Sequence, residues 1–257
     1  MTGLEQLTLL AAGLGAGVLT STVGVASLLS FPVLVALGIP PVVANASNTV
    51  GLIPAGLSGS FGYRAELREH PRVSLAVLLT CAGGAVIGAV LLLGLPSAVF
   101  EAVVPWLILF TCLLVGAQPT ISRWARRRRS GPRAEHQRTL MSPVTAGFAA
   151  LTGVYGGYFG AGSGVMMVAV LGFGLDLELR IVNALKTLAV LAGNVVAGLI
   201  FVVVAELDWP AIALLALGSV VGGYVGARVG RRLPPTVFRV LVVCAGLIAA
   251  TTMLVSP

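Results

Sequence analysis

The only lysine of the chain, Lys186, lies near the start of an uncharged apolar run from Ile181 to Ala205. A charged side chain within a segment of membrane-spanning length is costly and commonly marks a functional site. An ammonium group attracts anions, so a small anionic substrate is the chemistry that Lys186 could serve. The alternative is that Lys186, five residues into the run, extends its ammonium to the aqueous interface.

Amide and hydroxyl side chains accompany this lysine in a short segment that occurs twice. Asn183-Ala184-Leu185-Lys186-Thr187 in the second half of the chain corresponds to Asn45-Ala46-Ser47-Asn48-Thr49 in the first half. Such neutral groups either hydrogen bond to a substrate or join helices within the bilayer, and both interpretations remain open. The candidate substrate-binding side chains are Lys186, Asn183, Thr187, Asn194, Asn45, Ser47, Asn48 and Thr49.

A glycine-rich interruption, Gly156 to Gly164, divides the long apolar stretch from Val144 to Leu175. Thr20 to Gly24 interrupts the corresponding stretch from Leu7 to Leu37. Irregular backbone at membrane depth is tolerated where it is buried in protein or lines a wet cavity. Helix N-termini beside such a break suit an anion, whereas the alternative role of the glycines is close helix crossing. The break adds Gly160, Gly162, Ser163 and Gly164 to the candidate substrate site.

Several other kinds of chemistry are disfavoured. None of the nine acidic residues lies well inside an apolar run, which argues against a cationic substrate. The two histidines lie in polar loops, so the runs contain neither a histidine metal cluster nor a Ser-His pair. A phosphate-binding P-loop is missing too. We therefore predict no enzymatic activity, no metal, no cofactor and no nucleic-acid partner.

The composition indicates a membrane protein. Hydrophobic residues make up 57% of the 257 residues, charged residues only 10%, and the mean hydropathy is +1.02. Soluble domains carry about 25% charged residues. The long apolar runs exclude an outer-membrane barrel, whose strands alternate in short segments. The predicted fold class is an all-α polytopic membrane protein.

The spacing that separates Asn45 from Asn183 recurs beyond the polar segments. Gly84 and Gly88 match Gly222 and Gly226 at this spacing, and Leu95-Pro96 matches Leu233-Pro234. We predict two inverted repeats, each a broken or re-entrant helical hairpin plus three transmembrane helices. The predicted parts are repeat 1 (1–117), a basic cytoplasmic linker (118–142) and repeat 2 (143–257).

The arginines select this topology. If each broken stretch returns to its starting side, every arginine cluster lies on the cytoplasmic side, as the positive-inside rule requires. Both termini and the loops Gly94 to Pro96 and Glu206 to Asp208 then lie outside. The basic loops also suit anionic lipids. The clusters are Arg64, Arg68 and Arg72; Arg123, Arg126 to Arg129, Arg133 and Arg138; and Arg228, Arg231 and Arg232.

Four local patterns resemble the sulfite exporter TauE/SafE family. They are Asn45 to Tyr63 followed by Arg64, the break from Gly160 to Val168, Asn183 to Thr187, and Asp208 to Pro234. The resemblance covers essentially the whole chain. It implies a multi-pass plasma-membrane permease for small anions, mostly sulfite, sulfoacetate and related organosulfonates.

The chain departs from the family pattern in both repeats. Val23 to Ser27 replaces a glycine cluster, and Ala169 replaces a proline. The two half-sites are therefore expected to differ.

The combined prediction is a secondary transporter of small anions that works by alternating access in the cell membrane, with sulfite or organosulfonates as the expected substrates. Two other functions remain open: a passive anion channel and a non-transporting membrane scaffold. Oligomeric state is left open, and a homo-oligomer is compatible with the sequence.

Overall fold

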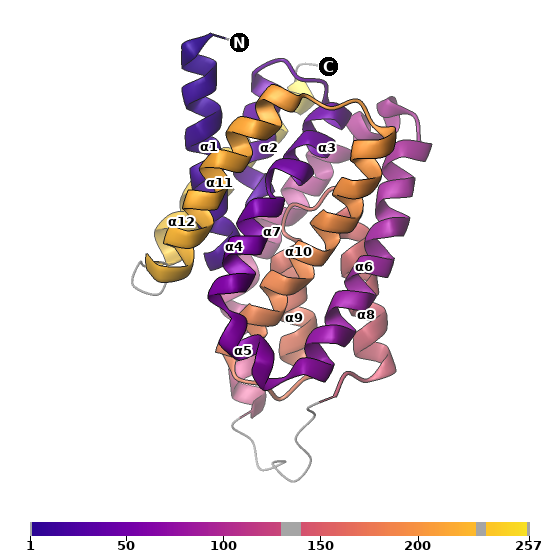
Figure 1. Ribbon diagram of the computed structural model, residues 1–257, viewed down its shortest axis with the longest axis vertical. Coiled ribbons are helices and arrows are strands. Elements are labelled where there is room, and N and C mark those ends of the chain that lie inside the picture. The colour runs from indigo at the N-terminus through magenta and orange to yellow at the C-terminus, as the bar shows by residue number, and fades with distance from the viewer. Residues whose placement is uncertain (1, 130–139, 230–234, 256–257) are drawn as a thin grey trace.

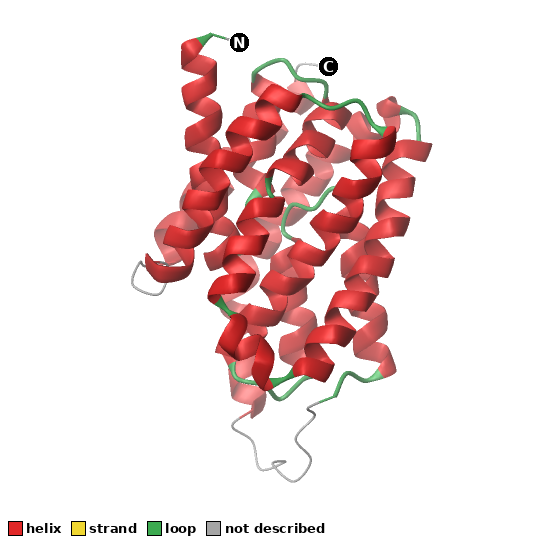
Figure 2. Ribbon diagram, viewed as in Figure 1, coloured by secondary structure: helices red, strands yellow, loops and turns green. Residues whose placement is uncertain are grey.

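The computed structural model describes residues 2–129, 140–229 and 235–255, and in these residues helices are joined by short loops without any strand (Figure 2). Figure 1 shows the helices running between two ends of an elongated bundle, with the N- and C-termini at the same end. Among the described residues, five helices are long and apolar enough to cross a membrane. The all-α polytopic class is confirmed.

The first apolar stretch forms a broken hairpin. Helix α1 (Gly3–Thr22) begins at a Thr2–Glu5 capping box and ends before Gly24, whose φ of 85° is accessible mainly to glycine. Helix α2 (Ser27–Ala36) follows, and its far end leads into the turn before α3. In Figure 1 that turn lies at the same end of the bundle as the N-terminus. The stretch therefore returns to the end where it started.

The second apolar stretch has the same form in the opposite direction. Helix α8 (Pro143–Tyr158) begins at Ser142, whose hydroxyl accepts from Thr145 N. Gly160 and Gly162, with φ of 81° and 79°, break the chain before α9 (Ser163–Gly174). Gly174 packs against Thr145, so close that a Cβ on Gly174 would lie 2.5 Å from the Thr145 hydroxyl oxygen. The end of α9 therefore lies beside the start of α8.

The remaining long helices cross between the two ends. Our predicted single run from Val42 to Phe61 bends at Leu52 into two helices, because Pro54 has no N–H to donate to the preceding turn. The equivalent helix of the second half is continuous. The crossing helices are α3 (Pro41–Gly51) with α4 (Ile53–Gly62), α6 (Pro71–Gly94), α7 (Ser97–Arg129), α10 (Leu179–Val204), α11 (Trp209–Val229) and α12 (Pro235–Val255), with the short α5 (Arg64–Glu69) at one end.

Each broken hairpin packs against a crossing helix of the other half of the chain. Helix α1 lies along α11, and α8 lies along α6, in both cases through glycines that bring the backbones together. On α6, Gly84 and Gly88 face the backbone of α8, and on α11, Gly222 and Gly226 face α1. These are the glycines that match between the two halves of the sequence. The packing fits the predicted duplication, whose inverted orientation across a bilayer stays a prediction.

The arrangement of loops agrees with the placement of charge. In Figure 1 the α6–α7 and α10–α11 connections lie at the end that carries the termini, and α5 lies at the opposite end. The first part of our predicted linker, 118–142, is helical, because α7 continues to Arg129. Arg133, Arg138, Arg231 and Arg232 lie outside the described residues.

An ion-pair network joins the two halves at the end that carries α5. Arg180 at the start of α10 donates to both carboxylate oxygens of Glu69, at 2.8 and 3.0 Å, and to Glu178 at 3.2 Å. Because the pairs are solvent-exposed, each contributes little stability in isolation. The two hydrogen bonds between the Arg180 guanidinium and the Glu69 carboxylate mainly fix the position of α5 against α10.

The topology can be tested by chemical labelling of single cysteines. In a variant lacking Cys81, Cys112 and Cys244, we expect a membrane-impermeant maleimide to label Leu95→Cys and Glu206→Cys in intact cells. Arg68→Cys should react only after permeabilisation, because the positive-inside rule places the arginine cluster in the cytoplasm. All three positions are exposed in the structure. Labelling of Arg68→Cys in intact cells would contradict the inverted arrangement.

Candidate functional site

The two breaks meet in the interior of the bundle. A Cβ placed on Gly164 would lie 2.7 Å from the Gly24 carbonyl oxygen, so the two backbones are in direct contact. Gly160 is also near the first break, with Ser27 Oγ 3.9 Å from the position of its Cβ. The contact brings together the C-terminal ends of α1 and α8 and the N-terminal ends of α2 and α9. Carbonyl groups and N–H groups that lack helical partners are therefore concentrated at one place.

Lys186 lies beside this junction and is 1% exposed. Its side chain passes Gly24, with Cδ 3.2 Å from the position of a Cβ on that glycine. The ammonium nitrogen Nζ donates to the Thr22 carbonyl oxygen at 3.5 Å. The ion pairs found among the described residues do not include Lys186. The ammonium is therefore turned to the junction rather than extended to the interface.

The C-terminal end of α1 receives donors from three separate elements. Besides Lys186 on Thr22, the Tyr63 hydroxyl donates to the Ser21 carbonyl oxygen at 3.5 Å. Gln118 Nε2, from α7, donates to the Val23 carbonyl oxygen at 3.4 Å. These contacts satisfy three consecutive carbonyl groups that the end of the helix leaves free.

A second cation, Arg239, acts on the C-terminal end of α1 through Gln118. Arg239 on α12 donates from Nε to Gln118 Oε1 at 3.1 Å, which orients the Gln118 amide toward Val23. Neither Gln118 nor Arg239 was predicted from the sequence as a site residue. Gln118 lies at the boundary of an apolar run, where a polar residue is ordinary. Arg239 could have been recognised from the sequence, because it is an arginine within the last apolar run and lies outside the three arginine clusters.

The end of α8 and the break after it receive neutral donors. Asn45 Nδ2, from α3, donates to the Tyr158 carbonyl oxygen at 3.0 Å. The Ala161 carbonyl oxygen accepts from the hydroxyls of Thr111, at 3.0 Å, and Tyr155, at 2.7 Å. Thus each half of the chain supplies a donor, Asn45 or Lys186, to the broken helix of the other half. The two ends differ in charge.

Unsatisfied polar groups accompany the junction. Asn45 Oδ1 and Asn48 Nδ2 are buried without a hydrogen-bond partner, although Asn48 Oδ1 accepts from the Ser30 hydroxyl. Within the described chain, the backbone N–H groups of Ser27 and Gly164, in the first turns of α2 and α9, also lack a backbone acceptor. Buried polar groups in native proteins are normally paired, so unpaired ones indicate a place for a ligand or water.

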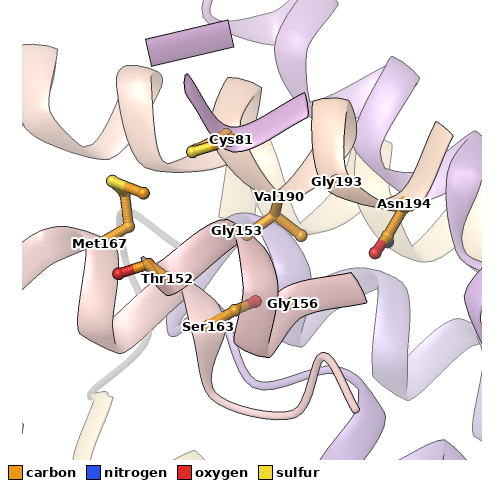
Figure 3. A pocket seen from close by; sticks show the side chains of 10 residues that line it. Cys81, Thr152, Gly153, Gly156, Ser163, Met167, Val190, Gly193 and Asn194 are labelled. Carbon is orange, nitrogen blue, oxygen red and sulfur yellow. The ribbon is translucent and has the colours of Figure 1, made fainter. Parts of the chain in front are cut away.

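A small cavity opens beside the N-terminal end of α9, between α6, α8, α9 and α10 (Figure 3). The cavity has a volume of about 10 Å³, which is room for roughly one water molecule. The lining includes two of the predicted residues, Ser163 and Asn194, whose labelled side chains lie on different helices in Figure 3. Its other polar groups are Thr152 and Cys81. The cavity is therefore too small to hold a polyatomic anion such as sulfite.

The structure divides the predicted residues into groups. Lys186, Asn45, Asn48 and the glycines of the second break surround the junction, and Ser163 and Asn194 line the adjacent cavity. The Ser47 hydroxyl faces elsewhere and accepts from Asp208 N, in the α10–α11 connection. The Thr49 and Thr187 hydroxyls donate to Asn45 and Asn183 carbonyl oxygens of their own helices. Asn183 itself is half-buried, one helical turn before Lys186.

The sequence was compared with those of known proteins and protein families. The family model for "Sulfite exporter TauE/SafE" matches residues 9–253. The chain belongs to this family. It is 28% identical over 247 residues to "Probable membrane transporter protein ORF9" of Sinorhizobium sp, covering 94% of this chain and 89% of the relative. It is 25% identical over 249 residues to a "Probable membrane transporter protein" of Haemophilus influenzae, covering 94% and 91%.

No solved structure matches the chain at a significant level. The family and the helices together make this TauE/SafE member a membrane transporter, whose family implies a small-molecule substrate. Among the described residues no group of three or more metal-ligating side chains is found.

The contact between the breaks can be tested by adding one methyl group. Gly164→Ala should push the two tips apart, since its Cβ would overlap the Gly24 carbonyl oxygen, and overpacking of this kind costs about 1–3 kcal/mol. We expect a lower midpoint of thermal unfolding for the purified protein in detergent. Gly147→Ala is the matched control, because a Cβ there meets nothing within 4 Å. Equal midpoints for the two variants would contradict the contact.

Proposed function

We propose that this TauE/SafE member is a secondary transporter of small anions in the cell membrane, with sulfite or organosulfonates as the substrate class. The observation that carries the proposal is the buried Lys186 ammonium, without a carboxylate ion-pair partner among the described residues, at the point where both broken hairpins meet. A buried cation without a carboxylate partner favours a negatively charged ligand.

The junction also supplies neutral donors for an oxyanion. The N–H groups of Ser27 and Gly164 lie at the N-terminal ends of α2 and α9, where the helix dipole favours negative charge. Asn48 Nδ2 is a further buried donor without a partner. Ser163 and Asn194, in the adjoining cavity, extend the set away from Lys186. A sulfite or sulfonate group has three oxygens, which suits donors converging from several sides.

The remaining predicted residues have supporting roles in this proposal. Asn45 holds the end of α8, and the backbone freedom of Gly160 and Gly162 lets the break form. The Thr49 and Thr187 hydroxyls donate to carbonyl oxygens of their own helices and stabilise α3 and α10, and Asn183 lies one helical turn before Lys186. Ser47 accepts from Asp208 N and so attaches α3 to the α10–α11 connection. We therefore give Ser47 a structural role and no contact with the substrate.

The closed shape of the site supports a mechanism of alternating access. The cavity beside the junction holds roughly one water molecule, so the anion enters only if the surrounding helices separate. The cross-packing of α1 on α11 and of α8 on α6 gives two bodies that can rock against each other around the junction. Transporters with inverted repeats commonly move in this way around a fixed midplane site.

Flux measurements on proteoliposomes test the proposal. We expect wild-type protein to carry sulfite or sulfoacetate with a rate that saturates with concentration, and Lys186→Ala to lose most of that flux. Arg180→Ala is the matched control, since it also removes one positive charge from α10 but at an exposed position. Its loss of flux should be smaller than that of Lys186→Ala.

The other outcomes separate the alternatives. Flux that rises linearly without saturation would favour an anion channel over a carrier. Normal flux in Lys186→Ala would contradict the role given to the ammonium. Absence of flux for both anions, in protein that inserts and folds, would contradict the proposed substrate class.

A further inference from the structure

The carbonyl end of α1 has a feature that anion binding does not explain. Three consecutive carbonyl oxygens, those of Ser21, Thr22 and Val23, each accept from a side chain of another element. One donor is an ammonium, and a second, Gln118, is itself oriented by the Arg239 guanidinium. Positive charge is therefore gathered at the negative end of the α1 dipole.

In transporters with broken helices, carbonyl groups at such helix ends commonly bind the coupling Na⁺ or proton. Carbonyl oxygens are good ligands for small cations because their lone pairs replace the hydration shell. Here the Lys186 ammonium donates to one such carbonyl oxygen, that of Thr22, at 3.5 Å. A Lys ammonium is a compact point charge with three donors, which makes it a suitable substitute for a bound monovalent cation.

The other half of the chain provides an internal comparison. Asn48 occupies the place in the first repeated segment that Lys186 occupies in the second, and its amide oxygen faces Ser30. In the second half, Asn45 donates to the end of α8 at Tyr158, and Thr111 and Tyr155 donate to the Ala161 carbonyl oxygen in the break that follows. The donors found at the second break are thus all neutral. The cation at α1 is an additional element.

We propose that the Lys186 ammonium is a built-in cation that occupies the position of a coupling ion at the carbonyl end of α1. This inference rests on the proposed transport function. It makes anion transport by this chain independent of Na⁺ and K⁺. Removal of the ammonium creates a vacant cation site that a small monovalent cation fills.

Thermal unfolding in detergent tests whether Lys186→Ala has a vacant cation site, and it does not require transport. In a choline chloride background, Lys186→Ala should unfold at a lower temperature than wild type, because the α1 carbonyl groups lose their charged donor. Adding methylammonium chloride should raise its midpoint in a saturable manner, since ligand binding to the folded state stabilises it by mass action. Wild type should show no such rise, and neither should the Arg180→Ala control, whose missing charge was exposed.

Flux in proteoliposomes tests the ion independence. Wild-type sulfite flux should be unchanged when Na⁺ and K⁺ are both replaced by choline. A flux that collapses without Na⁺ or K⁺ would overturn the inference, and this measurement decides the question even if Lys186→Ala does not fold. An unchanged midpoint for folded Lys186→Ala across the methylammonium titration would also overturn it.

The two proposals fail in distinguishable ways. If wild type carries neither anion, the proposed substrate class fails, and the unfolding measurement still decides whether Lys186 occupies a cation site. If wild type carries sulfite only together with Na⁺, the transport proposal stands and the built-in cation is refuted.

Discussion

Backbone groups released by a helix break within a membrane need partners inside the protein, and this constraint organises the whole structure. Water is unavailable in the bilayer core, and each unsatisfied group costs several kcal/mol, on the order of the transfer penalty for an amide. The chain meets the constraint by exchange between its halves: Lys186 on α10 supports the end of α1, and Asn45 on α3 supports the end of α8. Neither broken hairpin is satisfied by its own repeat alone. The two halves are therefore required to assemble as one unit, with the breaks in contact at Gly24 and Gly164.

The same constraint explains why the site is asymmetric although the halves correspond. The α8 break carries Gly160 and Gly162 and is satisfied by neutral donors, and a cavity remains beside α9. The α1 break has a single glycine of positive φ, Gly24, and gathers positive charge instead. An anion placed between them would contact a charged half and a neutral half. The glycine packing of α1 on α11 and of α8 on α6 keeps the hairpins tightly bound to their partners. Motion is then expected between these pairs and not within them.

Much of the fold followed from the sequence because hydropathy and charge report on the bilayer directly. Arginine placement predicted that each broken stretch returns to its starting end, which the positions of α2 and α9 agree with. The junction itself was only partly predictable. Lys186 and Asn45 were recognisable as polar groups in apolar runs, but their partners, Thr22 and Tyr158, lie in the opposite half of the sequence and contribute backbone atoms. Because every residue has a backbone carbonyl group, the sequence does not show which of these groups accept a hydrogen bond from a side chain. Gln118 was missed for a related reason, because its role depends on Val23 and Arg239 from distant helices.

The enclosure of the Lys186 charge at the junction is the central claim, and the amine itself can report on it. Because Lys186 is the only lysine, an amine-reactive reagent followed by mass spectrometry reads its accessibility without ambiguity. A lysine introduced at the exposed position 178, as Glu178→Lys, supplies an internal reference on the loop before α10. We expect Lys186 to react far more slowly than this reference in the folded protein and equally fast after unfolding in SDS. Comparable rates in the folded protein would show that the ammonium reaches the interface, and would contradict its enclosure at the junction.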